Sequence, residues 1–383
     1  MKGTESAIWA FVARALAGQA AVLTLPDHQI DFLPGGDGLV VSFEPVADQP
    51  VPADFDRPVW GQGFLLRRGC SVLGFKRRHN DWYREALLHR ALRALEAAGF
   101  FRSFRRVMFY GSSMGGHAAL ACAVVAPGCT VLALNPQSTL APGRCWFDQR
   151  FAGAGAAAWE GDFVDGADGA RAAARVYICY DPYQVKDRLH AQRLPPARRV
   201  NLRLPFAGHA TPRLLSQVGL LGPVFDKAWD GSLTEAEFRR LARERVRSAD
   251  YHLRLAGRGV FVPRRLRALD TALALEPGHA GATQARLLLG AGQGGTPPAT
   301  RAWPAGLVVA PRVPLVYLPI PMAASAVIQR HLLALAHGPS GDPRGAAEPE
   351  GLWRSQQPQD GAFIERCIAE GALTFTFVRD PGR

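Results

Sequence analysis

The sequence lacks an uninterrupted hydrophobic run long enough to cross a membrane. Its apolar start, residues 8–25, is broken by Arg14, Gly18 and Gln19, whereas a membrane-spanning helix needs about 20 consecutive, mainly apolar residues. The same interruptions make these residues a poor signal-peptide core. We therefore expect no membrane span and a cytoplasmic location.

Cysteine is scarce, and no two cysteines have the C-x-x-C spacing. The six lie in apolar or strand-like surroundings, which indicates reduced, buried thiols in a reducing compartment. No metal site is predicted. The cysteines are Cys70, Cys122, Cys129, Cys145, Cys179 and Cys367.

Acidic residues are too few to balance the basic ones, and the formal net charge is +12. Such a charge fits an anionic partner, for example nucleic acid, a membrane surface or an acidic glycan. The densest basic runs, residues 67–68, 76–78 and 102–106, are however short and carry no ladder of aromatic residues. Because charge alone cannot read bases, we expect no nucleic-acid partner.

Strand-like runs alternate with helical patterns over the first 225 residues. The helical patterns include residues 82–97 and 115–125, and Pro127 and Gly128 stop the second one. This alternation predicts an α/β fold with a doubly wound, mostly parallel sheet covered on both faces. The expected strands are residues 21–25, 39–43, 72–75, 107–110, 131–134, 176–180 and 200–204.

Amphipathic helices replace the strands from residue 214 to about 290. Residues 264–289 (RRLRALDTALALEPGHAGATQARLLL) resemble one tetratricopeptide helix pair joined at Pro277 and Gly278. A single repeat cannot bury its own apolar face, so a packed helical appendage is expected. The predicted domains are 1–225 for the α/β domain, 226–290 for the helical segment, 291–306 for a Gly/Pro-rich linker and 307–383 for a C-terminal α/β unit.

Residues 111–115 form a G-x-S-x-G pattern between a predicted strand and a predicted helix. This strand-turn-helix setting is the one that a nucleophilic serine at a strained turn requires, and it makes Ser113 the predicted nucleophile. The Met114 N–H at the helix N-terminus is a predicted oxyanion donor, and a second donor is expected in residues 76–82. The alternative is that the serine caps a glycine-rich helix start.

A serine hydroxyl needs a base that takes its proton and a carboxylate that orients the base. His209 follows the last predicted strand and precedes a helix, as the chain order serine, acid, histidine predicts, although it could instead be a structural loop histidine. His117, one turn into the helix after Ser113, is expected to be structural. For the acid, Asp181 at a strand end is favoured over Asp187 at the next helix start, because a strand end is the more rigid support. Asp181 could instead form a turn, and Asp187 could cap the helix.

The segments GSSMGG, DPYQVKDRLHAQRL and GHATPRLL resemble those of bacterial α/β-hydrolase domains. The resemblance covers about the first 225 residues. It implies hydrolysis of an acyl ester, on a small molecule or a glycan, through an acyl-enzyme and without a cofactor. Fold relatives also include acyltransferases and inactive scaffolds. Residues 141–174, with Trp146 and Trp159, occupy the cap position and are expected to shape the pocket.

Residues 315–333 and 373–383 resemble the two nucleotide-binding segments of carbohydrate-type sulfotransferases. The resemblance implies 3′-phosphoadenosine 5′-phosphosulfate as cofactor, with Ser325 at the 5′-phosphosulfate and Arg379 at the 3′-phosphate. Met322 stands where that family usually has a lysine, so the point charge at the transferring group is absent. We expect a truncated or degenerate sulfotransferase start, and the alternative is an unrelated strand-helix unit.

Overall fold

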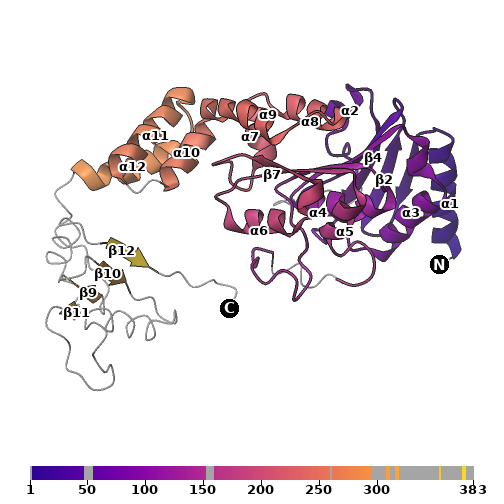
Figure 1. Ribbon diagram of the computed structural model, residues 1–383, viewed down its shortest axis with the longest axis horizontal. Helices are drawn as coiled ribbons and strands as arrows, with labels where there is room; N and C mark the ends of the chain where they lie inside the picture. Colours follow the sequence, from indigo (N-terminus) through magenta and orange to yellow (C-terminus); the bar gives the residue numbers. More distant parts are fainter. Residues whose placement is uncertain are drawn as a thin grey trace, which may run out of the picture. The chain divides into compact units, whose positions relative to one another are not determined.

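The computed structural model describes residues 2–46, 55–151, 159–258 and 261–294, together with four short strands beyond them. The chain divides into two compact units, Met1–Arg286 and Leu287–Arg383. Figure 1 shows the first unit as a sheet between layers of helices.

An eight-stranded sheet forms the centre of the first unit, in the order β1-β2-β4-β3-β5-β6-β7-β8. β2 runs antiparallel to both of its neighbours, and all pairs from β4 to β8 are parallel. This order and direction confirm the predicted α/β-hydrolase fold class. The strands are β1 Ala21–Thr24, β2 His28–Leu33, β3 Gly38–Phe43, β4 Ser71–Arg77, β5 Arg106–Ser112, β6 Thr130–Leu134, β7 Arg175–Tyr180 and β8 Arg199–Arg203.

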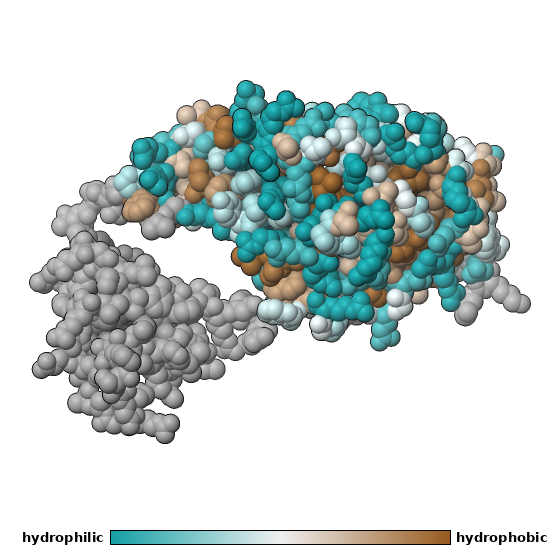
Figure 2. Space-filling model, viewed as in Figure 1, coloured by the Kyte–Doolittle hydropathy of each residue, from teal (hydrophilic) through white to brown (hydrophobic). Residues whose placement is uncertain are grey.

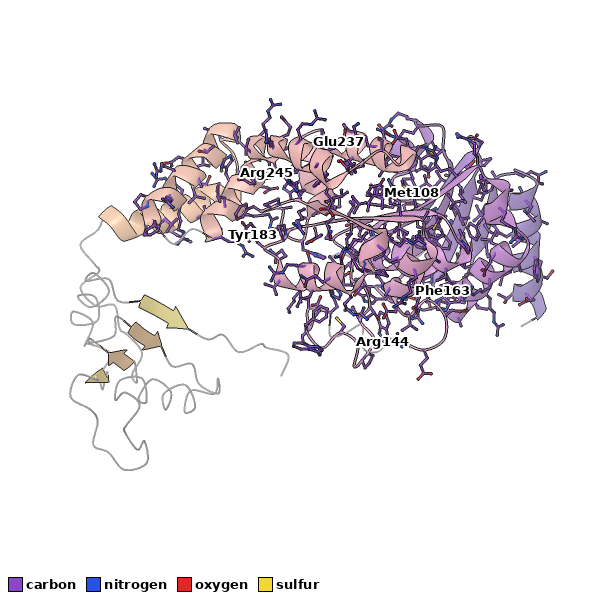
Figure 3. The ribbon with its side chains drawn as sticks, in the orientation of Figure 1. Met108, Arg144, Phe163, Tyr183, Glu237 and Arg245 are labelled. Atoms are coloured by element: carbon purple, nitrogen blue, oxygen red, sulfur yellow. The ribbon has the colours of Figure 1, made fainter. Side chains whose placement is uncertain are left out.

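The central strands are buried on both faces, because their side chains alternate between two hydrophobic cores. In β3, Leu39, Val41 and Phe43 belong to one core and Val40 belongs to the other. A continuous apolar run such as GLVVSF is typical of a parallel strand that is covered on both sides. Figure 3 shows Met108 of β5 inside the unit, where it belongs to the second core.

Helices cover both faces of the sheet and contribute to the two cores. The first core is covered by α1 Lys2–Leu16, α3 Ala86–Ala97, α4 Met114–Ala121, α5 Gly166–Ala172 and α6 Val185–Arg193. The second core is covered by α2 Gln62–Leu66, α7 Thr211–Gln217, α8 Leu221–Asp230 and α9 Glu235–Leu241.

The predicted domain boundary at residue 225 does not separate compact units. It would cut through α8, whose Phe225 and Ala228 are buried in the second core together with Phe238 of α9. The helical region is therefore continuous with the α/β domain as far as Arg286. The remaining helices are α10 Ala249–Arg258, α11 Val262–Leu275 and α12 Ala280–Gly294.

α11 and α12 correspond to the helix pair that the sequence predicts around Pro277 and Gly278. His279 in the turn between them hydrogen-bonds Asp250 of α10 through Nε2 at 3.0 Å. This contact ties the pair to the preceding helix. Its likeness to a tetratricopeptide repeat stays a prediction.

The second unit contains a four-stranded sheet in the order β11-β9-β10-β12. β10 and β12 are parallel neighbours, and they begin the two segments that resemble sulfotransferase sequences. Ser325, Met322 and Arg379 lie outside the described residues. The strands are β9 Val308–Ala310, β10 Leu315–Leu318, β11 Trp353–Arg354 and β12 Leu373–Thr376.

Hydrophilic side chains predominate on the face of the first unit seen in Figure 2, and apolar residues are scattered among them. None of the described helices combines the length and the apolar character that a membrane crossing requires. The described side chains likewise contain no cluster of three or more histidine, cysteine or acidic residues suited to a metal ion.

Candidate active site

Ser113 occupies a sharp turn between β5 and α4. Its backbone has φ 52° and ψ −118°, a conformation that a residue with a Cβ rarely adopts. The two glycines of the motif allow this turn, since a Cβ at Gly111 would lie against the carbonyl oxygen of Gly115, and one at Gly115 against that of Phe43. Strand, strained turn and helix thus follow one another as the sequence predicts.

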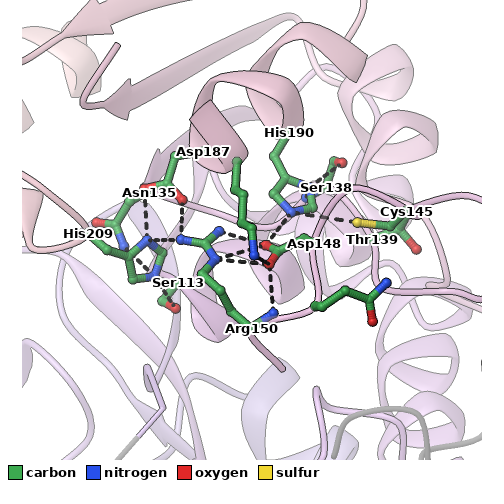
Figure 4. A network of polar contacts seen from close by, with 12 residues as sticks. Ser113, Asn135, Ser138, Thr139, Cys145, Asp148, Arg150, Asp187, His190 and His209 are labelled. Carbon is green, nitrogen blue, oxygen red and sulfur yellow. Dashed lines mark hydrogen bonds and ion pairs between the residues drawn. The ribbon is translucent and has the colours of Figure 1, made fainter. Parts of the chain in front are cut away.

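His209 lies in the loop between β8 and α7 and reaches Ser113 across 96 positions of sequence. Its Nε2 is 2.9 Å from Ser113 Oγ (Figure 4). Gly208, immediately before it, has φ 62°, a conformation that suits glycine and allows the loop to turn toward the serine. The two residues that the sequence predicts as nucleophile and base are therefore in hydrogen-bond contact.

Asp187, and not the favoured Asp181, lies against His209. Asp187 Oδ2 is 2.8 Å from His209 Nδ1, and the Asp187 side chain is fully buried. A carboxylate can only accept, so Nδ1 carries the proton and Nε2 is left to accept from Ser113. Asp187 is not the cap of α6 either, because Gln184 holds that position.

Both carboxylate oxygens of Asp181 accept hydrogen bonds from backbone N–H groups, which corrects the expectation that Asp181 orients His209. Its Oδ1 accepts from the N–H of Tyr183 and its Oδ2 from the N–H of Gly208, both at 2.9 Å. Asp181 thus forms the turn before α6 and fixes the loop that carries His209.

Ser113 and His209 line a cavity of about 360 Å³. Its walls are mostly apolar and include Trp60, Phe151 and the loop after β3. The residues that line it are Pro45, Val46, Trp60, Ser112, Ser113, Asn135, Phe151, His209, Ala210, Pro212 and Arg213.

The loop beside the nucleophile follows β3, not β4, which corrects the expected place of the second oxyanion donor. The sheet order sets β3 between β4 and β5, so residues 45 and 46 line the cavity with Ser113 and residues 76–82 do not. Met114 is the first residue of α4, where helical N–H groups have no acceptor within the helix.

The segment expected to shape the pocket does so in part. Phe151 lines the cavity of Ser113, whereas the side chain of Trp146 is 79% exposed. Trp159 lines a larger cavity of about 860 Å³ that contains neither Ser113 nor His209. Residues 152–158 lie outside the described part of the chain.

His117 does not line the cavity of Ser113 and His209, as expected. It is buried beside the rings of Trp82 and Trp159, and burial lowers its pKa to about 3. A neutral imidazole packed among aromatic rings is a structural residue.

Asn135 is a further polar residue at the site, and no pattern in the sequence indicated it. It follows β6 directly, and its Nδ2 donates to His209 Nε2 at 3.3 Å. Thr211 Oγ1 donates to Asn135 Oδ1 at 2.6 Å and so fixes the orientation of the amide. The pairing of β5 with β6 brings Asn135 beside the serine.

A buried polar network continues from Asp187 into the protein (Figure 4). Arg150 contacts Asp187 and Asp148, Asp148 contacts His190, and His190 Nδ1 lies 3.0 Å from Ser138 Oγ. This second serine-histidine-aspartate contact is fully enclosed, because Ser138 and His190 are completely buried. Both side chains are closed to solvent, so this contact offers no place for a substrate.

Comparison with known proteins gives likenesses of structure but none of sequence. No family model matches the sequence, and no curated protein matches it. Among solved structures, the capsule O-acetyltransferase of Neisseria meningitidis serogroup A is 13% identical, with a TM-score of 0.37 over 55% of this chain and 94% of that one. MPT51 of Mycobacterium tuberculosis is 14% identical, with a TM-score of 0.36 over 53% and 93%. A bacterial heroin esterase is 15% identical, with a TM-score of 0.35 over 59% and 87%. These values are too low to carry an activity from those proteins to this chain.

Proposed function

We propose that this chain is a serine hydrolase of esterase type that cleaves an acyl ester. The observation that carries the proposal is the continuous contact from Ser113 Oγ to His209 Nε2, at 2.9 Å, and from His209 Nδ1 to Asp187 Oδ2, at 2.8 Å, beside a cavity. These are the distances and the order that nucleophilic catalysis by serine requires.

In the proposed reaction, Ser113 Oγ attacks the ester carbonyl carbon while its proton passes to His209 Nε2. The negative charge of Asp187 stabilises the imidazolium that forms. The Met114 N–H, together with an N–H of the loop after β3, would bind the oxygen that becomes negative. His209 then protonates the leaving alcohol. Water, deprotonated by the same imidazole, attacks the acyl carbon, and His209 returns the proton to Ser113 Oγ as the acid leaves.

The shape of the site supports an acyl group of modest size. A cavity of about 360 Å³ lies at the small end of ligand pockets. Its walls of Trp60, Phe151 and Val46 favour an apolar chain. We expect turnover of p-nitrophenyl esters to be fastest for short acyl chains and to fall as the chain outgrows the cavity.

The test is covalent labelling with a fluorophosphonate probe, followed by peptide mapping. We expect the probe on Ser113, no labelling of Ser113→Ala, and labelling of the neighbouring control Ser112→Ala. Ester turnover should fall by about 10³-fold or more in Ser113→Ala. Folded protein that takes up no probe would refute the hydrolase and favour a non-catalytic scaffold.

We also propose a nucleotide site for the second unit, as a separate function. The parallel pairing of β10 and β12 supports it, because the carboxyl ends of the two strands that begin the sulfotransferase-like segments then lie at the same edge of a sheet. The ligand would be 3′-phosphoadenosine 5′-phosphosulfate. Calorimetric titration with adenosine 3′,5′-bisphosphate should give saturable binding that Arg379→Ala weakens, and the absence of binding heat would refute it.

A further inference from the structure

Arg150 lies between two buried carboxylates, and both of them occupy its guanidinium. Nε and Nη2 bind Asp148, at 3.0 and 2.6 Å, and Nη1 is 2.7 Å from Asp187 Oδ1. The Arg150 side chain is 25% exposed, whereas both carboxylates are fully buried. Arg150 is thus committed to the protein and not to a substrate.

Asp148 carries a negative charge, and its histidine partner His190 is neutral. The backbone N–H of Ser138 donates to His190 Nδ1 at 3.1 Å, so Nε2 carries the proton that His190 donates to Asp148 at 3.0 Å. Burial lowers the pKa of His190 despite the nearby carboxylate. Burial alone would raise the pKa of Asp148, but hydrogen bonds from His190 and Arg150 outweigh it and hold that pKa well below its usual range.

The contact of Arg150 with Asp187 leaves one oxygen for the histidine. Arg150 holds Oδ1, and Oδ2 accepts from His209 Nδ1. The guanidinium also approaches the imidazole itself, since Nη1 is 3.4 Å from Nδ1. Nδ1 already donates its proton to Asp187 and cannot accept a hydrogen bond from Arg150. The approach of the guanidinium therefore places a positive charge beside the ring without a hydrogen bond to it.

We infer that Arg150 is a positioning residue that acts through Asp187 and sets the pH at which His209 works as a base. The inference rests on the proposed hydrolase function. By sharing Asp187, Arg150 fixes the carboxylate and opposes formation of the imidazolium. Asp148 holds Arg150 in place and offsets part of its charge.

Other polar and charged groups face His209 or its loop from several elements. They are Ser113 at the elbow, Asn135 after β6, Asp187 on α6, Asp181 through the N–H of Gly208, Arg213 in the cavity wall, and Arg254 of α10 against Gly208. Among the described residues, Arg150 is the cation that approaches the imidazole ring, with Nη1 3.4 Å from Nδ1. Its loss should therefore change the charge at the ring most directly.

Two substitutions should shift the acid limb of the pH–rate profile, where the rate falls as His209 becomes protonated, in opposite directions. Arg150→Gln removes a positive charge and favours protonation of the His209–Asp187 pair, so the limb moves up by about one pH unit. Asp148→Asn removes a negative charge, so the limb moves down by about half a unit. General destabilisation of the fold would not produce shifts of opposite sign.

The experiment measures the rate constant of fluorophosphonate labelling of the full chain from pH 5 to pH 9. The proteins are wild type, Arg150→Gln, Arg150→Lys, Asp148→Asn and the control Arg93→Met, which breaks the Arg93 pairs with Asp162 and Glu96. We expect the limbs of the Lys variant and of the control to lie within about 0.3 pH unit of wild type.

The outcomes separate the inference from the proposed function. Labelling of Arg150→Gln and Asp148→Asn with limbs at the wild-type pH would overturn the inference and leave the hydrolase intact. If Arg150→Gln does not fold, the downward shift in Asp148→Asn decides the question, and an unmoved limb there overturns the inference. A wild-type protein without labelling would refute the hydrolase itself.

Discussion

At the scale of single residues, two aspartates after β7 have different tasks. Asp187 accepts from the imidazole of His209, and Asp181 accepts from two backbone N–H groups. Asp187→Asn should lower ester turnover by about 10³- to 10⁴-fold, because an amide in place of the carboxylate favours the wrong tautomer of His209.

Asp181→Asn is the matched control for this prediction. An asparagine still accepts one of the two backbone hydrogen bonds, so we expect turnover to fall less than about tenfold, with a lower Tm. Steady-state kinetics and thermal unfolding of both variants measure these effects. A larger loss of turnover in Asp181→Asn than in Asp187→Asn would contradict the assignment.

Some residues of the site could be predicted from the sequence, and others could not. Ser113 and His209 each follow a recognisable strand, so their places along the chain imply their places in the fold. Asp181 and Asp187 both follow β7. The choice between them depends on the direction in which the Asp187 side chain points from α6, and the sequence does not show that direction. Arg150 reaches the site from a loop, and no spacing along the chain indicates that contact.

At the scale of secondary-structure elements, the turn between β5 and α4 tolerates no side chain at its two glycines. A Cβ at Gly115 would press on the backbone of Phe43 at the end of β3 and of Glu44 in the loop after it. Gly115→Ala should therefore cost about 1–3 kcal/mol of unfolding free energy and slow fluorophosphonate labelling, because it displaces Ser113. Gly128→Ala is the control, since a Cβ there meets no atom within 4 Å and its positive φ gives a modest loss of stability alone. Equal labelling rates in the two variants would argue against this role of Gly115.

The contact between β2 and the start of α3 should make stability depend on pH. His28 is completely buried, with Nδ1 2.7 Å from Glu85 and Nε2 3.3 Å from Asp81. Burial alone would lower its pKa, but hydrogen bonds and charges of Asp81 and Glu85 outweigh it and raise the pKa to about 9. In the unfolded chain the value is about 6.5. The resulting stabilisation is therefore complete below pH 6.5 and is lost as the pH rises through 9.

His28→Gln should remove this dependence. We expect its Tm to lie roughly 5 °C below that of wild type at pH 6, with the gap narrowing by pH 9. His79→Gln is the control, because the His79 side chain is 70% exposed. A gap between wild type and His28→Gln that stays constant from pH 6 to pH 9 would show that the charge of His28 is not the cause.

β2 also explains why the sequence predicts the wrong loop beside the nucleophile. His28 and Asp31 interrupt the apolar pattern of HQIDFL, so the segment does not read as a strand, although four of its six residues are buried. The apolar runs of the other strands predict that they exist but not their order in the sheet. That order depends on crossover connections, and here it places β3 and not β4 beside β5.

At the scale of the whole molecule, the change from strands to helices after residue 214 predicts a domain boundary that the packing does not show. Helices that follow the last strand of a sheet can still belong to the core of that domain. Leu233 and Phe238 are buried in the same core as Leu132 of β6 and Leu202 of β8. Composition shows where the element type changes, and only contacts show where one core ends.

Truncation tests this view of the chain. Residues 1–294 contain the first unit and the whole of α12, so we expect this fragment to fold alone and to be labelled at Ser113 at the rate of the full chain. A fragment of residues 1–225 cuts α8 and removes Ala228, Leu233 and Phe238 from the second core. Since burying one large apolar side chain contributes about 1.5–3 kcal/mol, the shorter fragment should be insoluble or unfolded. Circular dichroism and labelling of both fragments measure this difference. A folded, labelled 1–225 fragment would show that the helices after residue 225 are an appendage, as the sequence predicts, and not part of the catalytic unit.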